Sequence, residues 1–328
     1  MVSGGGLRRF GDLITKRFSV TFSVVLVIGL AWQDLAHAVR PYIAWLLIGV
    51  IYLGFLRVNL GGLGEELRRW KRVVGMIVGL QIVIPALGYW GLLAICKALG
   101  WESEWAAGSL LILLAPAGAI VPTLCLLMHG RFERGILLLV IGSLLVPVTM
   151  PLMLWALLGA AGELTPLQVA RFLAMVMLVP AAAAVITRRF TPKVVDAVHD
   201  NVPLLSVLGL CGVIVGAVAG LKPVLFDEPS RALIGGVLST LAFLFAFAAA
   251  WFFAGGSPRD RMTLAIAATW TNIALAIVTA NRLFAETAPL IVLATTLGEI
   301  PWNILFPPAQ WFADKLVKAK EELGAIAE

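Results

Sequence analysis

The chain has 328 residues, of which 60% are hydrophobic and only 13% are charged. A soluble globular chain is roughly 45–50% apolar and about 25% charged, and a soluble chain of this size could not bury so much apolar surface. The composition therefore predicts a protein whose partner is the lipid bilayer. The net charge of +6 does not indicate a nucleic-acid partner, because the basic residues fall in short clusters between long apolar runs.

The cysteines and the N-terminus exclude other classes. Cys96, Cys125 and Cys211 all lie inside apolar runs. Their odd number and their spacing argue against a disulfide framework, and no C-x-x-C or His/Cys cluster predicts a metal or another bound cofactor. The basic N-terminus leads into an apolar run without an A-x-A-type cleavage site, so we expect no cleaved signal peptide.

Continuous apolar runs predict an all-α membrane protein with ten transmembrane helices, because a spanning helix needs about 20 mostly apolar residues. We expect these spans at residues 18–36, 41–60, 73–97, 105–128, 135–159, 169–187, 202–221, 232–254, 262–281 and 287–312. The alternation of the ten spans places 19 of the 25 Lys and Arg residues on one side and 6 on the other. The positive-inside rule then predicts a multi-pass protein of the cell (inner) membrane with both termini in the cytoplasm.

The spans divide into two similar halves, repeat one at about 18–160 and repeat two at about 169–312. Span 4 is interrupted at Pro116-Ala117-Gly118, and span 9 at the polar run 269–272, an offset near 154 residues. An odd number of spans in each repeat inverts the second half in the membrane. This architecture recurs in secondary transporters, which bind substrate near the midplane between broken helices.

The break in span 4 predicts half of a substrate site. Pro116 and Pro122 stand on either side of Gly118, and the backbone groups that a proline frees at membrane depth need protein, water or ligand as partners. The half-helix beyond the break points its positive N-terminal end into the protein, which suits an anionic or polar substrate. We expect Pro116, Gly118 and Thr123 to frame the site; the alternative is a purely structural kink.

The polar run in span 9 predicts the other half. Thr269 and Thr271 can bond back to their own helix, whereas Asn272 needs an interhelical partner or a ligand to satisfy its amide. We expect these three residues to complete the substrate site.

Glu299 is the acidic residue that lies deepest in any span. An ionisable group at that depth is costly and usually functional. Burial favours its neutral form, so Glu299 could take up and release a coupling proton. The alternative is a protonated glutamic acid that bonds a neighbouring helix.

Four segments resemble the motifs of one known family. Gln81-Ile82-Val83-Ile84-Pro85 resembles a Gln-x-x-x-x-Pro element, here one residue shorter, and Ala115-Pro116-Ala117-Gly118 resembles Cys-Pro-Gly-Gly. Ser143-Leu144-Leu145-Val146-Pro147 resembles the end of a fifth span, and Asn272-Ile273-Ala274-Leu275-Ala276 resembles Asn-Ser-Gly-Leu-Ala. These are motifs of the bile acid:sodium symporter family. The resemblance implies a single transporter domain over residues 1–328, in which a core (spans 3–5 and 8–10, with helices 4 and 9 crossed) rocks against a panel (spans 1, 2, 6 and 7).

The chain departs from the sodium-coupled members of that family where their side chains bind sodium. Span 4 of those members has a Ser-Asn pair, where this chain has Val121 and Pro122. Span 5 has two hydroxyls, where this chain has Gly135 and Leu139, and span 9 has a glutamate and a glutamine, where this chain has Ala267 and Thr271. A hard cation needs several oxygen ligands, preferably with a carboxylate, so the resemblance implies that the sodium sites are lost. Gln81, Ser143 and Glu299 are the candidate ion-coupling residues, for sodium or for a proton.

These observations predict a secondary active transporter, and not an enzyme, that carries a small organic anion or amphipathic solute by alternating access. The alternative is proton-coupled efflux of arsenite or a related oxyanion. Glu299-Ile300-Pro301 resembles a Glu-Val-Pro element of the arsenite-resistance carriers, but Ala115 stands in the place of their metalloid-binding cysteine. An enzyme would need a constellation such as H-E-x-x-H or G-x-S-x-G, which the spans lack, and a channel would show pore-lining polar stripes.

Overall fold

A computed structural model describes residues 18–57, 64, 68–159, 165–193, 195, 201–305, 308–309 and 311–315. Over these residues the chain forms helices and no strand beyond one isolated bridge. Long apolar segments become helices because a helix satisfies every backbone polar group within its own segment, which a bilayer demands. The prediction of an all-α protein is confirmed for the described part of the chain.

The helices of the first half are α2 (Phe18–Ala31), α3 (Gln33–Val39), the 3-10 turn η1 (Arg40–Tyr42), α4 (Ile43–Arg57), α6 (Trp70–Val78), the π-helical turn η3 (Gly79–Val83), α7 (Ile84–Leu99), α8 (Glu104–Leu114), α9 (Val121–Leu127) and α10 (Phe132–Leu158). Those of the second half are α11 (Pro166–Phe190), α13 (Val202–Ala217), α14 (Leu221–Asp227), α15 (Pro229–Phe253), α16 (Pro258–Thr269), α17 (Ile273–Phe284), α18 (Pro289–Leu297) and α19 (Glu299–Ile304).

Among the described residues, five helical segments are long and apolar enough to cross a membrane, and they make this a multi-pass α-helical membrane protein. They are Gln33–Leu56, Trp70–Leu99, Phe132–Leu158, Pro166–Phe190 and Pro229–Phe253. A pair bent by 62°, Leu204–Ala217 with Leu221–Asp227, adds a sixth if it counts as one span. These segments match the expected spans 2, 3, 5, 6 and 8, and the bent pair matches span 7. The other expected spans fall on shorter or interrupted helices, so the count of ten stays a prediction.

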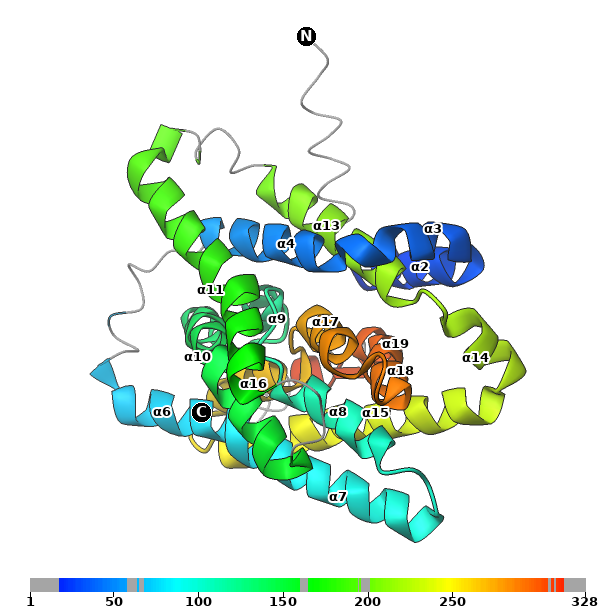
Figure 1. Cartoon of the computed structure of the whole chain (residues 1–328). Coiled ribbons are helices and arrows are strands. Elements are labelled where there is room, and N and C mark those ends of the chain that lie inside the picture. Colours follow the sequence, from blue (N-terminus) through cyan, green and yellow to red (C-terminus); the bar gives the residue numbers. More distant parts are fainter. Residues whose placement is uncertain are drawn as a thin grey trace.

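The helices lie in layers (Figure 1). Along one side run α2, α3, α4 and α13, and along the opposite side run α6, α7 and α15. Between them lie the short helices α8, α9, α17, α18 and α19. Packing follows this order, because α4 packs on α13 and α11, whereas α8 packs on α7 and α18. The interrupted helices are therefore at the centre of the molecule, covered on both sides.

The central helices break for a local reason. Ala115 is extended (φ −63°, ψ 140°), because the ring of Pro116 disfavours helical backbone at the residue before it. Helix α8 therefore stops at Leu114. Helix α9 begins again at Val121 with Pro122 in its first turn, where the missing N–H costs little.

Candidate functional site

The two broken helices meet at their breaks. Ala117 and Thr271 form an isolated antiparallel bridge. The Gly118 N–H donates to the Trp270 carbonyl at 2.9 Å, and the Asn272 N–H donates to the Pro116 carbonyl at 2.7 Å. The unwound segment between α8 and α9 and that between α16 and α17 thus supply each other's backbone partners, as is required away from water.

Gly118 makes this close approach possible. A Cβ atom at this position would lie 2.9 Å from the Trp270 carbonyl oxygen and 3.2 Å from that of Thr271. Both atoms belong to backbone that is already held in the bridge, so neither can move aside alone. A glycine is needed here for the approach of two chains, and not for an unusual backbone angle.

Thr271 replaces a hydrogen bond that Pro116 removes. A proline at position 116 has no N–H for the carbonyl four residues earlier, which is that of Ile112. The Thr271 hydroxyl donates to this carbonyl oxygen at 3.1 Å. The Trp302 indole N–H in turn donates to the Thr271 carbonyl at 3.2 Å. Thr271 is therefore fixed by α8 on one side and by α19 on the other.

A partly open cavity, the front cavity, lies between the crossing and the outer layer; its empty space of about 600 Å³ includes space open to solvent. One wall is apolar and consists of Leu47, Val50 and Ile51 of α4 with Leu210, Val213 and Ile214 of α13. The opposite wall is the crossing itself, with Gly118 and the polar side chains of Thr271, Asn272, Glu299 and Trp302.

The polar groups of the front cavity suit one small polar group of a ligand. The Asn272 Oδ1 accepts from the Leu275 N–H at 3.2 Å, as the N-cap of α17. Its oxygen is thus committed, and its NH₂ group is the donor that a ligand can use. Glu299, 2% exposed, is the ionisable side chain of this wall, and no Lys, Arg or His is among the described residues that line the cavity.

A second, much smaller cavity, the rear cavity, lies on the other side of the crossing and has room for about one water molecule. Its lining includes Gln81, Pro116, Gly142, Ala267 and Thr271. The Gln81 Nε2 donates to the Gly142 carbonyl at 2.8 Å, and the Thr149 hydroxyl donates to the Gln81 Oε1 at 3.0 Å. Each end of this amide makes a hydrogen bond within the protein. The described lining residues contribute no carboxylate, so they do not match the oxygen set that a hard cation prefers.

The structure separates the predicted site residues into three groups. Gly118, Thr271, Asn272 and Glu299 meet at the front cavity, and Pro116 and Gln81 line the rear cavity, which Thr271 shares.

The third group, Thr123, Thr269 and Ser143, lines neither cavity. Thr123 lies on the exposed face of α9. Thr269 is buried and donates to the Ala265 carbonyl of its own helix at 2.8 Å. Ser143 is buried in α10 beside Gly142.

Two contributors were not predicted from the sequence. Trp302 follows Glu299 by three residues, one helical turn later, and this spacing places both on the same face. Thr149 lies between Pro147 and Pro151 and gave no such signal. Cys125, the thiol nearest to the break of span 4, is buried on α9 and lines neither cavity.

Comparisons with known proteins identify the family of the chain. Residues 44–228, more than half of the chain, match the profile of the Sodium Bile acid symporter family. The chain is also similar to the uncharacterized sodium-dependent transporter YocS of Bacillus subtilis (strain 168). The two are 24% identical over 216 residues, which cover 65% of this chain and 65% of the relative. The chain thus spans about two thirds of the length of the curated relative that it matches. On the match of residues 44–228, the chain belongs to the sodium bile acid symporter family.

Proposed function

We propose that the protein is a secondary active transporter that carries a small organic anion or a similar amphipathic solute by alternating access. The front cavity binds the solute, and Glu299 carries the coupling proton. The observation that carries this proposal is the position of the front cavity. It joins a polar wall, built by two broken helices at their crossing, to an apolar wall on a different helix layer.

The shape of the front cavity supports an amphipathic solute. The apolar body packs against α4 and α13, and the polar group faces Asn272 and Glu299. An anion in this cavity needs donors. The Asn272 NH₂ group and a protonated Glu299 can supply them, and the partial positive charge at the N-terminus of α17 adds to the attraction. Binding of the anion is therefore linked to a proton on Glu299, because an ionised carboxylate in the same cavity would repel the solute.

We infer that sodium is not the coupling ion. The rear cavity holds Gln81 with both ends of its amide hydrogen-bonded, and the Thr271 hydroxyl donates to Ile112. The name of the Bacillus relative includes sodium dependence, but the described lining of the rear cavity offers a cation no carboxylate.

The proposed architecture has ten spans in two inverted repeats, at about 18–160 and 169–312. Panel spans 1, 2, 6 and 7 include α4, α11 and α13, and core spans 3–5 and 8–10 include the crossing. The pairing of one break from each half supports the repeats. The unequal distribution of Lys and Arg supports cytoplasmic termini in the inner membrane.

Binding of cholate, a bile acid, to the purified protein tests the proposal. Cholate should raise the melting temperature of the wild type more at pH 5.5 than at pH 7.5, because binding needs the protonated carboxyl. Glu299→Gln, which imitates the protonated form, should bind cholate equally at both pH values. Glu286→Gln, which removes an exposed carboxylate between α17 and α18, should behave as the wild type.

Transport in liposomes completes this test. A pH gradient should drive cholate uptake by the wild type in choline chloride as well as in sodium chloride, and Glu299→Gln should bind cholate without proton-driven uptake. If Glu299→Gln took up cholate in response to a pH gradient as fast as the wild type, Glu299 would not be the residue that carries the coupling proton. If millimolar sodium chloride raised the melting temperature in a saturable way and choline chloride did not, the protein would bind sodium, and the proposal that sodium is not the coupling ion would be contradicted.

A further inference from the structure

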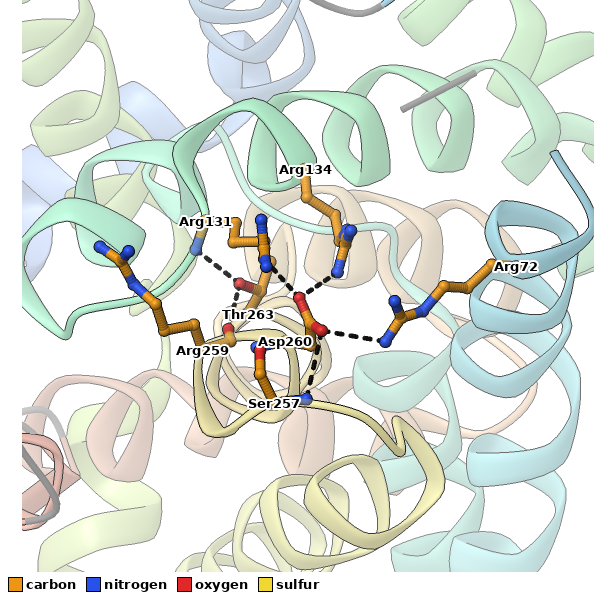
Figure 2. A network of polar contacts seen from close by, with 7 residues as sticks. All are labelled: Arg72, Arg131, Arg134, Ser257, Arg259, Asp260 and Thr263. Atoms are coloured by element: carbon orange, nitrogen blue, oxygen red, sulfur yellow. Dashed lines mark hydrogen bonds and ion pairs between the residues drawn. The ribbon is translucent and has the colours of Figure 1, made fainter. Parts of the chain in front are cut away.

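Three arginines surround one buried carboxylate at the ends of three helices (Figure 2). The Asp260 Oδ2 pairs with the Arg72 guanidinium at 3.0 Å, and the Oδ1 pairs with Arg131 at 2.5 Å and with Arg134. The Ser257 N–H also donates to Asp260 at 3.3 Å. Figure 2 shows the guanidinium groups of these three arginines directed toward Asp260, whereas that of Arg259 points away. We call Arg72, Arg131, Arg134 and Asp260 the arginine cluster.

The arginine cluster carries more positive than negative charge. Arg134 and Asp260 have side chains that are 2% and 5% exposed, so together they form a buried neutral pair. Arg72 and Arg131 then add two charges that share the same carboxylate. Their side chains are 33% and 42% exposed, so a molecule from the surface can reach them.

The N-terminal ends of three helices add to this excess of positive charge. Arg72 lies in the first turn of α6, Arg131 directly before α10, and Asp260 in the first turn of α16. The N-terminal end of a helix carries a partial positive charge, which stabilises anions and disfavours cations. Three helix N-termini thus meet where two arginine charges are not balanced within the four residues of the arginine cluster, and an additional anion would relieve this repulsion.

We propose that the exposed side of the arginine cluster is a binding site for a phosphate group, separate from both cavities. Arg72 and Arg131 donate hydrogen bonds to the phosphate oxygens, because a planar guanidinium group can form two parallel hydrogen bonds to one phosphate. Asp260 pairs with the same two arginines from the buried side, so it competes with the phosphate for their charge. The expected spans place this cluster at the membrane surface, so an anionic phospholipid headgroup is the nearest source of phosphate, and free phosphate is the other source.

The backbone beside the cluster is fixed independently of any ligand. The Arg131 N–H donates to the Thr263 hydroxyl at 2.7 Å, and this hydroxyl donates to the Arg259 carbonyl at 2.7 Å. The start of α10 is thereby attached to α16, so Arg131 projects from a rigid position. A site with a fixed backbone loses less entropy when a ligand orders its side chains.

Lipid binding by the full-length protein in nanodiscs tests this proposal. Phosphatidylglycerol mixed into phosphatidylcholine should raise the melting temperature in a saturable way. Arg131→Gln and Arg72→Gln should each weaken the apparent affinity about tenfold or more, because each removes a charge-assisted hydrogen bond. Arg189→Gln is the matched control, since it removes an exposed arginine at the end of α11, and it should keep the wild-type affinity. Inorganic phosphate, titrated in pure phosphatidylcholine, shows whether free phosphate is bound as well.

A variant that removes the carboxylate should have the opposite effect on phosphate affinity. Asp260→Asn removes the internal competitor for the arginines, so phosphatidylglycerol or phosphate should bind it several-fold more tightly and restore part of its lost stability. A cluster that only holds helices together would show no such gain. Equal losses in Arg189→Gln and Arg131→Gln, or no stabilisation by either form of phosphate, would overturn the proposal.

Discussion

The Thr271 hydroxyl lies 3.1 Å from the carbonyl oxygen of Ile112, 159 residues earlier in the chain. Pro116 leaves this oxygen without its helical donor, and the partner comes from the other broken helix. One side chain therefore caps the end of helix α8, contacts both broken helices and lines both cavities. The front cavity and the rear cavity are therefore joined through this residue.

Thr271→Val keeps the shape of the side chain and removes the donor. A buried carbonyl that loses its partner costs about 1–3 kcal/mol, so the variant should unfold at lower temperature and bind cholate more weakly. Thr271→Ser retains the hydroxyl and should restore most of both properties. Thermal unfolding and cholate titration of the three proteins check this; equal behaviour of the valine and serine variants would contradict the role of the hydroxyl.

Gly118→Ala should disturb the crossing. The new methyl group would lie 2.9 Å from the Trp270 carbonyl oxygen, and overpacking of this kind typically costs about 1–3 kcal/mol. Gly91→Ala on α7 is the control, because a Cβ there meets nothing within 4 Å. The control should be neutral or more stable by roughly 0.5–1 kcal/mol, since alanine favours the helix. Melting temperatures in one detergent decide between these expectations, and a stable Gly118→Ala would show that the crossing has room to spare.

Asp260 should make the free energy of unfolding decrease at acidic pH. Burial raises the pKa of this carboxyl, but Arg134 and the Ser257 hydrogen bond lower it, and so do Arg72 and Arg131, so the pKa falls from 3.8 to about 2. A folded-state pKa below that of the unfolded chain stabilises the fold above about pH 4, and this stabilisation is lost as the pH falls toward 2.

The size of this effect follows from the shift, since each pKa unit corresponds to about 1.4 kcal/mol. The wild type should lose about 2 kcal/mol of stability between pH 4 and pH 2 through this group. Asp260→Asn should be less stable at neutral pH and should lack this part of the acid response. Unfolding curves of both proteins over this range are the measurement; parallel curves would show that the carboxylate is not stabilised by its arginines.

Arg40 and Asn281 connect the outer layer to α17, the helix that begins at the crossing. The Arg40 guanidinium, next to α4, donates to the Asn281 Oδ1 on α17 at 2.8 Å. Asn281→Ala should loosen this contact and speed the alkylation of Ala274→Cys in the front cavity by about two- to tenfold, the range expected for one exposed hydrogen bond. Asn281→Asp offers Arg40 a full charge and should slow the alkylation. Identical rates in all three backgrounds would mean that this contact does not control access.

The sequence by itself determined that the lipid bilayer surrounds this protein and where two of its helices are interrupted. Long apolar runs can only be satisfied as helices in a bilayer, and five such runs appear as continuous helices. The breaks at Pro116 and at 269–272 were visible because proline and polar residues at membrane depth have direct local consequences. The resemblance to the family was visible in short motifs of spans 3, 4, 5 and 9, and the match of residues 44–228 shows the membership.

Tertiary structure alone decided which of those residues face the cavities. Thr123, Thr269 and Thr271 are the same residue type in similar apolar runs, yet one is exposed, one bonds its own helix, and one completes the other broken helix. The arginine cluster was equally hidden, because the sequence presents Arg72, Arg131 and Arg134 as topology signals and gives no distance to Asp260. Contacts between residues more than a hundred positions apart depend on how the helices pack, and no local preference of the chain encodes them.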